Sequence, residues 1–249
     1  MPRKMGEALK EIVGEGADEK GEKKRRPVSV LMNPNRLRIF QFLCNFPCSH
    51  QKRIARGLDL SNPTVRWHIQ KLILSGYVKG KVVSGRAVYY PAEMISGDKA
   101  IEAFYWMGDR DVNLLFRAVL ERQGSTIEDL TAALDGGRSK VRSGLATLER
   151  LGIIVPVIDG RFKRYFPTDE VSSIESQNRK RLRQFKRFLM KKLEGDRLSP
   201  EVHMSRSREA EIHIRVGKRR TSLKIPPEPL TSVITSFGET DESGEEIED

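Results

Sequence analysis

The sequence repeats itself with a period of 76 residues, and this repeat limits the possible folds more than any other feature. Apolar matches alone arise by chance, but here Gly, Arg and Pro residues also coincide without a gap. The repeat therefore predicts a duplicated structural unit. The shift aligns Val65-Arg66 with Val141-Arg142, Gly76-Tyr77-Val78 with Gly152-Ile153-Ile154, and Tyr89-Tyr90-Pro91 with Tyr165-Phe166-Pro167.

The first copy has start and stop signals for three helices and a β-hairpin. Pro34 opens a helix that runs to about residue 45, and Ser49 can cap a second short helix that runs to about residue 58. Ser61 caps a third helix, which runs to Ser75 and is stopped by Gly76. Two β segments follow, at 77–83 and 87–90, with Ser84-Gly85 as the turn between them.

The second copy predicts the same order of elements. Its first helix spans about 111–122, and Ser125 with Glu128 forms a capping box for the second helix. A third helix runs from about 138 to 151. Asp159-Gly160 is a strong signal for the turn of the hairpin that follows.

Three helices with a tight turn before the third form a helix-turn-helix, and the hairpin adds a wing. The segment 60–72, Leu-Ser-Asn-Pro-Thr-Val-Arg-Trp-His-Ile-Gln-Lys-Leu, ends at Gly76-Tyr77-Val78. It resembles the recognition helix and strand entry of ArsR- and MarR-type winged-helix regulators. Over residues 28–168 the chain resembles prokaryotic, archaeal, tandem winged-helix transcription regulators. The second copy departs from the pattern, because Gly137 replaces the capping Ser and Gly144 interrupts the helix.

The resemblance implies DNA binding, and the helical periodicity indicates which side chains face outward. Val65, Ile69, Leu72 and Ile73 share one face of the third helix and are expected to pack inward. A helix in the major groove reads base edges through its N-terminal residues. We therefore expect base contacts from Asn62, Thr64, Arg66 and Trp67. We expect phosphate contacts from Lys71 and from the wing residues Lys79, Lys81 and Arg86.

Two further residues of the first copy's third helix have other expected roles. Trp67 could equally pack on a neighbouring domain, and His68 beside the core stripe is expected to be structural.

The same positions of the second copy give a second candidate set. The equivalent candidates in the second copy are Arg138, Lys140, Arg142, Ser143, Arg161, Lys163 and Arg164.

The charge agrees with a polyanionic partner. The chain of 249 residues has 45 Lys+Arg against 34 Asp+Glu, a net charge of +11 and a pI near 9.7. The last 11 residues hold seven acids and no base, so the rest of the chain is more basic still. We expect this acidic tail, 237–249, and the charged arm, 1–27, to be flexible.

Two further segments follow the duplicated region. Residues 172–194 form a strongly basic helix with an apolar stripe, which could dimerise, pack on the second winged helix with its basic side towards DNA, or lie on a membrane surface. Residues 209–226 alternate as a hairpin, which must pack on another element or on its copy in a partner chain.

The sequence contains no P-loop, dinucleotide fingerprint or hydrolase motif, so we expect no enzyme activity and no cofactor. Cys44, Cys48 and His50 are one possible metal group, but zinc sites need four ligands at tighter spacing. ArsR-type sensors often carry a cysteine pair in the helix-turn-helix, and the third helix here has none. We therefore predict no metal site.

We expect a mainly α (α+β) fold and a sequence-specific double-stranded-DNA-binding transcription regulator. The alternatives are a non-specific chromatin protein and a winged-helix protein-interaction module. We expect cytoplasmic, nucleoid-associated localisation, with a homodimer through 172–194 and the transcription machinery as candidate partners and no membrane contact. The expected organisation is an arm (1–27), a first winged helix (28–93), a connecting helix (94–110), a second winged helix (111–168), a basic helix (169–196), a β-hairpin module (197–236) and a tail (237–249).

Overall fold

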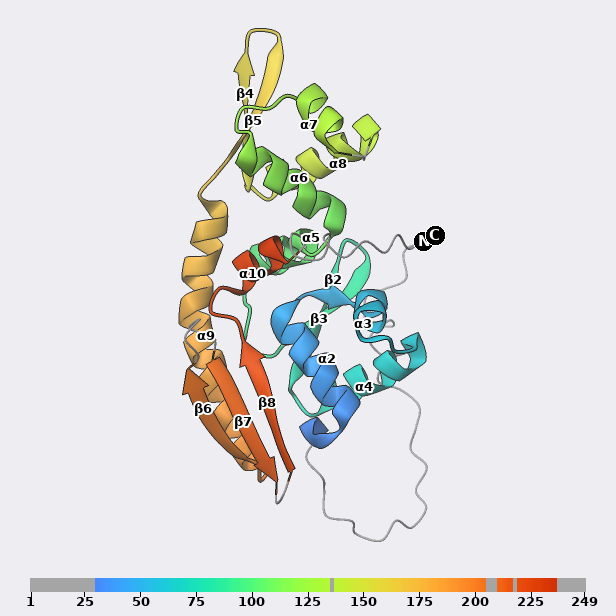
Figure 1. The fold of residues 1–249 in the computed structure, drawn as a ribbon, viewed down its shortest axis with the longest axis vertical. Helices are drawn as coiled ribbons and strands as arrows, with labels where there is room; N and C mark the ends of the chain where they lie inside the picture. Colours follow the sequence, from blue (N-terminus) through green and yellow to red (C-terminus); the bar gives the residue numbers. More distant parts are fainter. Residues whose placement is uncertain (1–29, 135–136, 205–209, 217–218, 237–249) are drawn as a thin grey trace.

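A computed structural model describes residues 30–134, 137–204, 210–216 and 219–236. The fold is α+β, with helices and small antiparallel sheets (Figure 1). The predicted arm and acidic tail lie outside the described residues.

The first copy folds into three helices backed by a small sheet. The turn η1 (Val30–Met32) precedes α2 (Pro34–Asn45), β1 (Ser49–His50), α3 (Gln51–Leu58), α4 (Asn62–Leu74), β2 (Val78–Val83) and β3 (Arg86–Pro91). The sheet order is β1-β3-β2. Phe40 from α2 and Tyr77 from the entry to β2 are fully buried, and their rings meet edge to face. This contact joins α2 to the entry of the sheet, and α4 in turn contacts both α2 and β2.

The second copy repeats this order after a connecting helix. That helix, α5 (Asp98–Met107), is followed by α6 (Arg110–Glu121), α7 (Ile127–Ala133), α8 (Gly137–Arg150), β4 (Ile154–Asp159) and β5 (Phe162–Pro167). In Figure 1 the two copies lie one above the other along the long axis of the molecule.

Backbone hydrogen bonds recur at a spacing of 76 residues. The amide of Tyr77 donates to the carbonyl of Leu72 at 2.9 Å, and the amide of Ile153 donates to that of Leu148 at 2.9 Å. The isolated bridge between Ser125 and Tyr165 is the counterpart of the pairing between residues 49 and 89. The period found in the sequence is thus also a period of the backbone.

Two predicted caps are wrong by one residue. His50, not Ser49, caps α3, and its Nδ1 accepts from the amide of Arg53. Thr126 with Asp129, rather than Ser125 with Glu128, forms the capping box of α7. The two serine hydroxyls instead donate backwards, to the carbonyls of Phe46 (2.7 Å) and Arg122 (2.6 Å), and help close the preceding turns.

The turn of the second hairpin is also displaced by one residue. Asp159 pairs with Phe162, so the two loop residues are Gly160 and Arg161. Gly160 has a φ of 58°, the left-handed conformation that a glycine adopts without strain.

The C-terminal region is larger than the predicted hairpin. It contains α9 (Glu170–Gly195), β6 (Ser199–Met204), β7 (Ala210–Val216), β8 (Arg219–Ile225) and α10 (Pro229–Thr235), and the strand order is β6-β7-β8. The sheet contacts α9 through β6 and α2 through β8, and its apolar side chains Ile212 and Leu223 are buried, as an isolated hairpin could not achieve. Helix α10 contacts α2, α5 and α9, so it lies at the junction of the chain's parts.

The apolar stripe of α9 is buried within this chain. Leu182, Phe185, Leu189 and Leu193 are almost fully covered, and α9 contacts β6 and α10. Near its C-terminus, the Nζ of Lys192 lies 4.8 Å from the centre of the Tyr77 ring. A membrane-surface helix needs an exposed apolar face, and α9 does not offer this stripe. In the described ranges, moreover, no helix has the length and apolar character to cross a membrane.

A buried carboxylate links α9 to α10. Glu175 accepts a hydrogen bond from the amide of Thr231 at 2.7 Å, while its Oε2 is buried without a partner among the described residues. Burial raises the pKa of this carboxyl, and the bond from Thr231 only partly opposes the rise.

Candidate nucleic-acid interface

Helix α4 presents its N-terminal side chains to solvent because its other face is anchored. The amide of Thr64 donates to Oγ of the cap residue Ser61 at 3.2 Å, and Val65 and Ile69 are buried. Asn62, Arg66 and Lys71 are exposed, as predicted for a recognition helix. The hydroxyl of Thr64 lies 2.7 Å from that of Ser61, so it already takes part in the cap.

Trp67 is held in an outward position by its neighbours. It is 51% exposed, its ring meets that of His68 edge to face, and the Nζ of Lys71 lies 5.7 Å from its centre. His68 is buried as expected, and burial lowers its pKa, with a smaller contribution from Arg36. The indole is thus in contact with a buried imidazole and a lysine, and half of its surface remains exposed.

An open hollow of about 610 Å³ lies where the helix-turn-helix meets the wing. It brings together two predicted residues, Asn62 at the start of α4 and Arg86 at the start of β3. Gln51 ties the two helix starts, because its Nε2 donates to the carbonyl of Asn62 at 2.8 Å. The residues lining the hollow are His50, Gln51, Lys52, Asn62, Arg86, Ala87 and Tyr89.

The electrostatics of this hollow favour an anion. The pKa of His50 is lowered by burial first, and then by the positive charges of Arg86, Arg53, Lys52 and Arg56. Arg66 is close enough to Tyr89 to oppose the rise that burial causes in the pKa of that phenol. Cations from α3, α4 and the wing therefore act on the same volume, which suits a phosphate group.

Three residues of this hollow, Gln51, Lys52 and Tyr89, were not among the predicted contacts. Lys52 and Gln51 lie in the first turn of α3, and Tyr89 is half-buried on β3. A signal was present, since Lys52 and Arg56 are four residues apart and hence on one face of a helix. The predicted contacts came from the third helix and the wing alone, so α3 was left out.

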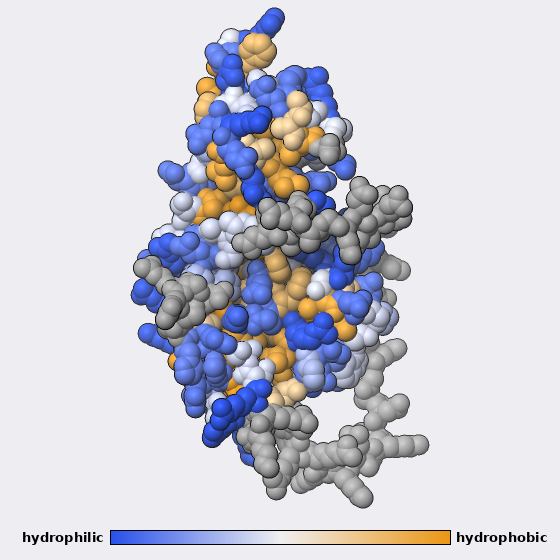
Figure 2. Space-filling model, in the orientation of Figure 1, coloured by the Kyte–Doolittle hydropathy of each residue, from blue (hydrophilic) through white to orange (hydrophobic). Residues whose placement is uncertain are grey.

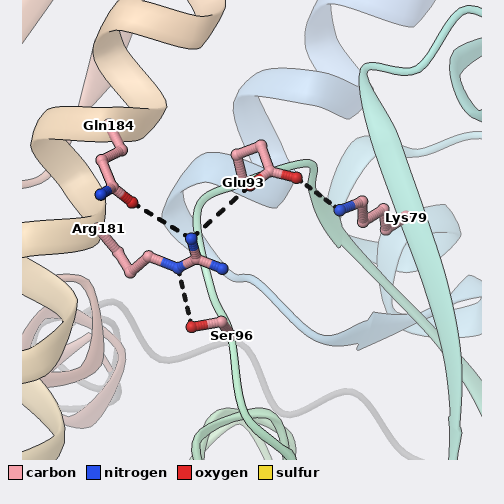
Figure 3. Close-up of polar contacts among 5 residues, drawn as sticks. All are labelled: Lys79, Glu93, Ser96, Arg181 and Gln184. Atoms are coloured by element: carbon pink, nitrogen blue, oxygen red, sulfur yellow. Dashed lines mark hydrogen bonds and ion pairs between the residues drawn. The ribbon is translucent and has the colours of Figure 1, made fainter.

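The predicted wing lysines are engaged within the chain. The Nζ of Lys79 lies 2.6 Å from Oε1 of Glu93, and Lys81 pairs with Asp98 at the start of α5. Figure 3 shows Glu93 between Lys79 and Arg181 of α9, which also donates to Ser96. These lysines therefore tie the first wing to the connector, whereas no described residue forms an ion pair with Arg86.

Most candidates of the second copy are likewise paired with acids. Arg138 pairs with Glu128 (2.6 Å), Lys140 with Asp111 (3.7 Å), Lys163 with Glu149 (3.2 Å) and Arg164 with Asp159 (2.6 Å). Arg142 and Ser143 are exposed on α8, and Arg161 stacks over Phe162 at 5.0 Å. Unlike the cations of α4, most of the candidate cations on α8 and its wing are therefore already paired with acids.

The second wing also differs from the first in exposing apolar side chains. Val155, Val157 and Phe162 share one face of the hairpin and are 43–47% exposed, and Ile158 on the other face is 71% exposed. Figure 2 shows orange and blue residues interleaved at the upper end of the molecule, where Figure 1 places β4 and β5. By contrast, the described strands of the first wing, β2 and β3, expose one large apolar side chain, that of Val82.

The cysteines are structural. Cys44 and Cys48 are free and fully buried, and burial raises the pKa of both thiols. His50 is used as a helix cap. Among the residues that the structure describes, no group of His, Cys, Asp or Glu is arranged to hold a metal ion.

Three helices, a tight turn before the third and a hairpin behind it define the winged helix-turn-helix class. Residues 32–79 match the family described as winged helix-turn-helix DNA-binding. The match covers α2, α3, α4 and the start of β2. The chain therefore carries a winged helix-turn-helix domain of the DNA-binding kind.

A protein of similar sequence agrees with this assignment. The uncharacterized HTH-type transcriptional regulator MJ1398 of Methanocaldococcus jannaschii is 24% identical over 142 residues, which are 57% of this chain and 35% of that protein. The chain thus matches about a third of the length of that relative. The similarity is to a protein named as an HTH-type transcriptional regulator.

Two solved structures are similar in part. The DIP2311 protein from Corynebacterium diphtheriae has 17% identity and a TM-score of 0.23, over 57% of this chain and 28% of that one. T. acidophilum IdeR has 19% identity and a TM-score of 0.21, over 80% of this chain and 95% of that one. Both TM-scores are too low to indicate a shared overall arrangement.

Proposed function

We propose that this chain is a sequence-specific, double-stranded-DNA-binding transcription regulator that reads the major groove with α4. The observation that carries the proposal is the exposed start of α4 beside a cation-lined hollow. No described acid is ion-paired with Arg66, Lys71 or Arg86. Phosphate groups supply the missing negative charge, and base edges reach the residues at the helix start.

The side chains have separate roles in this proposal. Arg66 and Asn62 read base edges, since Arg recognises G and Asn recognises A in bidentate fashion. Trp67 packs on sugar or on a thymine methyl group. Lys71, Lys52 and Arg86 hold phosphates and set the register, with no preference for sequence. Lys79 and Lys81 can also hold phosphates, but only if each first releases the carboxylate with which it is paired.

The second copy is proposed to extend the same site along the duplex. Exposed ion pairs are worth only about 0–1 kcal/mol each, so a phosphate can displace their acids. Arg142 and Ser143 need no such displacement. The predicted contacts of the second copy are Arg138, Lys140, Arg142, Ser143, Arg161, Lys163 and Arg164.

The test is selection of random duplexes on the purified chain at about 150 mM salt, since affinity depends on ionic strength. An enriched motif supports the proposal, and two half-sites assign DNA contact to both copies or to a dimer. Retention of DNA without enrichment favours the non-specific chromatin alternative.

A second candidate function is favoured by the second wing. Exposed apolar residues on a hairpin suit a protein partner better than a phosphate backbone. In this alternative the second copy contacts another protein, such as a component of the transcription machinery, while the first copy holds DNA at the nucleoid. Val157→Ser with Ile158→Ser would then abolish the partner contact and leave duplex affinity unchanged.

We also propose a homodimer through residues 172–194, and the fold restricts which surface of the helix it can use. Because the apolar stripe of α9 packs within the chain, such a dimer would have to use the exposed, basic side of the helix. Like charges would then face one another, and a polyanion between the two copies would be needed.

A further inference from the structure

We infer that the outer face of α9 is a second DNA-binding surface, which holds the phosphate backbone of a different duplex segment from the one at α4. The chain would thereby bridge two segments of DNA. This inference rests on the proposed function, since it takes α4 as the first contact.

Four exposed cations form a stripe along α9: Lys180, Arg183, Arg187 and Lys191. At about 100° per residue they cluster on the side of the helix opposite Phe185 and Leu189, which are fully buried. The stripe spans 11 residue steps, or about 16 Å at 1.5 Å per residue. It is therefore a continuous surface and not scattered charge.

The four cations have no acid partner among the described residues, and this sets them apart from their neighbours. Arg179 pairs with Glu228, Arg181 contacts Glu93 and Ser96, and Lys192 lies over Tyr77. The basic residues on the sides of α9 thus hold the fold together, while those of the stripe do not. Ion pairing within the fold therefore does not account for the four cations of the stripe.

The chemistry of the stripe fits duplex backbone. A duplex carries about one negative charge per 1.7 Å of its axis, which matches an extended row of cations. Single strands are bound by stacking on aromatic rings, and the stripe has none. A membrane surface would also need the apolar side of α9, which is covered.

The position of α9 indicates a second segment. In Figure 1, α9 runs along one side of the molecule and α4 and α8 lie on the other. The margin where α9 lies is mostly hydrophilic in Figure 2. DNA is stiff over about 150 base pairs, so one straight duplex at α4 does not turn back to reach α9.

The experiment measures capture of a labelled duplex by the full chain bound to a second, bead-held duplex, at about 150 mM salt. The test variant changes Lys180, Arg183, Arg187 and Lys191 to Ala, which is the best helix former, so α9 should persist. The matched control removes four other exposed cations that form no ion pair among the described residues: Arg122, Arg215, Arg220 and Lys224. Affinity for one short duplex is measured for each protein.

We expect the test variant to capture at least about tenfold less of the second duplex, with its affinity for one short duplex unchanged. The control should capture normally. Equal losses in both variants would reduce the effect to bulk charge and overturn the inference, as would absence of capture by the unmodified chain. Binding of no duplex at all would overturn the proposed function itself.

Discussion

Arg66 leaves α4 on its exposed side and approaches Tyr89 at the edge of the hollow. We predict that Arg66→Ala weakens binding to the preferred duplex by about 1–3 kcal/mol and relaxes preference at one base pair. Titrations against duplexes that differ at single positions measure both effects. Arg150→Ala, outside the interface, is the matched control. The same loss on every duplex would instead make Arg66 a phosphate contact.

Glu175 is the residue with the clearest consequence for pH. Its pKa is raised by burial, so the folded state binds a proton more tightly than the unfolded state does. Stability from this group is therefore full at low pH and falls as the pH rises from its ordinary pKa towards the raised one.

We predict that Glu175→Gln flattens this dependence and stabilises the fold at neutral pH. The amide oxygen can still accept from the amide of Thr231, and no buried charge remains. Urea unfolding at several pH values measures the effect, with Glu194→Gln on the exposed side of α9 as the control. A steeper loss of stability with rising pH in the Gln variant would contradict the assignment.

At the scale of the elements, Gly144 explains how α8 packs. A Cβ at this position would lie 2.6 Å from Cδ2 of Leu115, which is buried on α6. The glycine that interrupts the recognition-helix pattern thus permits the close approach of α6 and α8. Its presence reflects packing and says nothing against a role for α8 in recognition.

We predict that Gly144→Ala destabilises the fold by about 1–3 kcal/mol, because Leu115 must leave its rotamer or shift α6. Chemical denaturation measures the change. Gly195→Ala is the control, since nothing lies within 4 Å of its added methyl group, and there alanine should be neutral or stabilising. Equal effects of the two changes would show that helix propensity, not packing, decides.

The elements could be predicted well where local signals were redundant, and their edges less well. The first and third helices of each copy begin within one or two residues of the expected positions. The caps of α3 and α7 were missed because two capping residues stand side by side, and the choice depends on how the preceding turn closes. The strand β6 is an edge strand that pairs with β7 alone, and it contains Pro200, which weakens the local signal for a strand.

At the scale of the molecule, the C-terminal region fastens the fold. Gln41 of α2 exchanges two hydrogen bonds with the backbone of Lys224, at 2.7 and 2.8 Å. Tyr77 donates to Asp196 at 2.7 Å. Such contacts join residues more than a hundred positions apart, and the sequence offered no means of pairing them. The acids that pair with Lys79 and Lys81 are nearer in sequence, but no local pattern marked those pairs either.

We predict that Phe185→Ala lowers the free energy of unfolding by about 3–5 kcal/mol, since a fully buried ring is lost. The unfolding midpoint should not change with protein concentration, because the ring packs inside its own chain. Denaturation at several concentrations checks this, with the half-buried Phe188→Ala as a milder control. A midpoint that rises with protein concentration would show that the apolar stripe of α9 packs in a dimer.

The ion pairs of the first wing have a consequence for how binding responds to salt. The hydrogen bond from Lys79 lowers the pKa of Glu93, so this carboxylate stays charged beside the cation at neutral pH. Glu93 and Asp98 are thus internal counterions, covalently attached and always present. When a phosphate replaces them, the DNA releases its condensed counterions, but each freed carboxylate takes up a small cation, so the net release of ions is smaller. The affinity of this protein for DNA should then fall less steeply with salt than the number of its basic contacts implies.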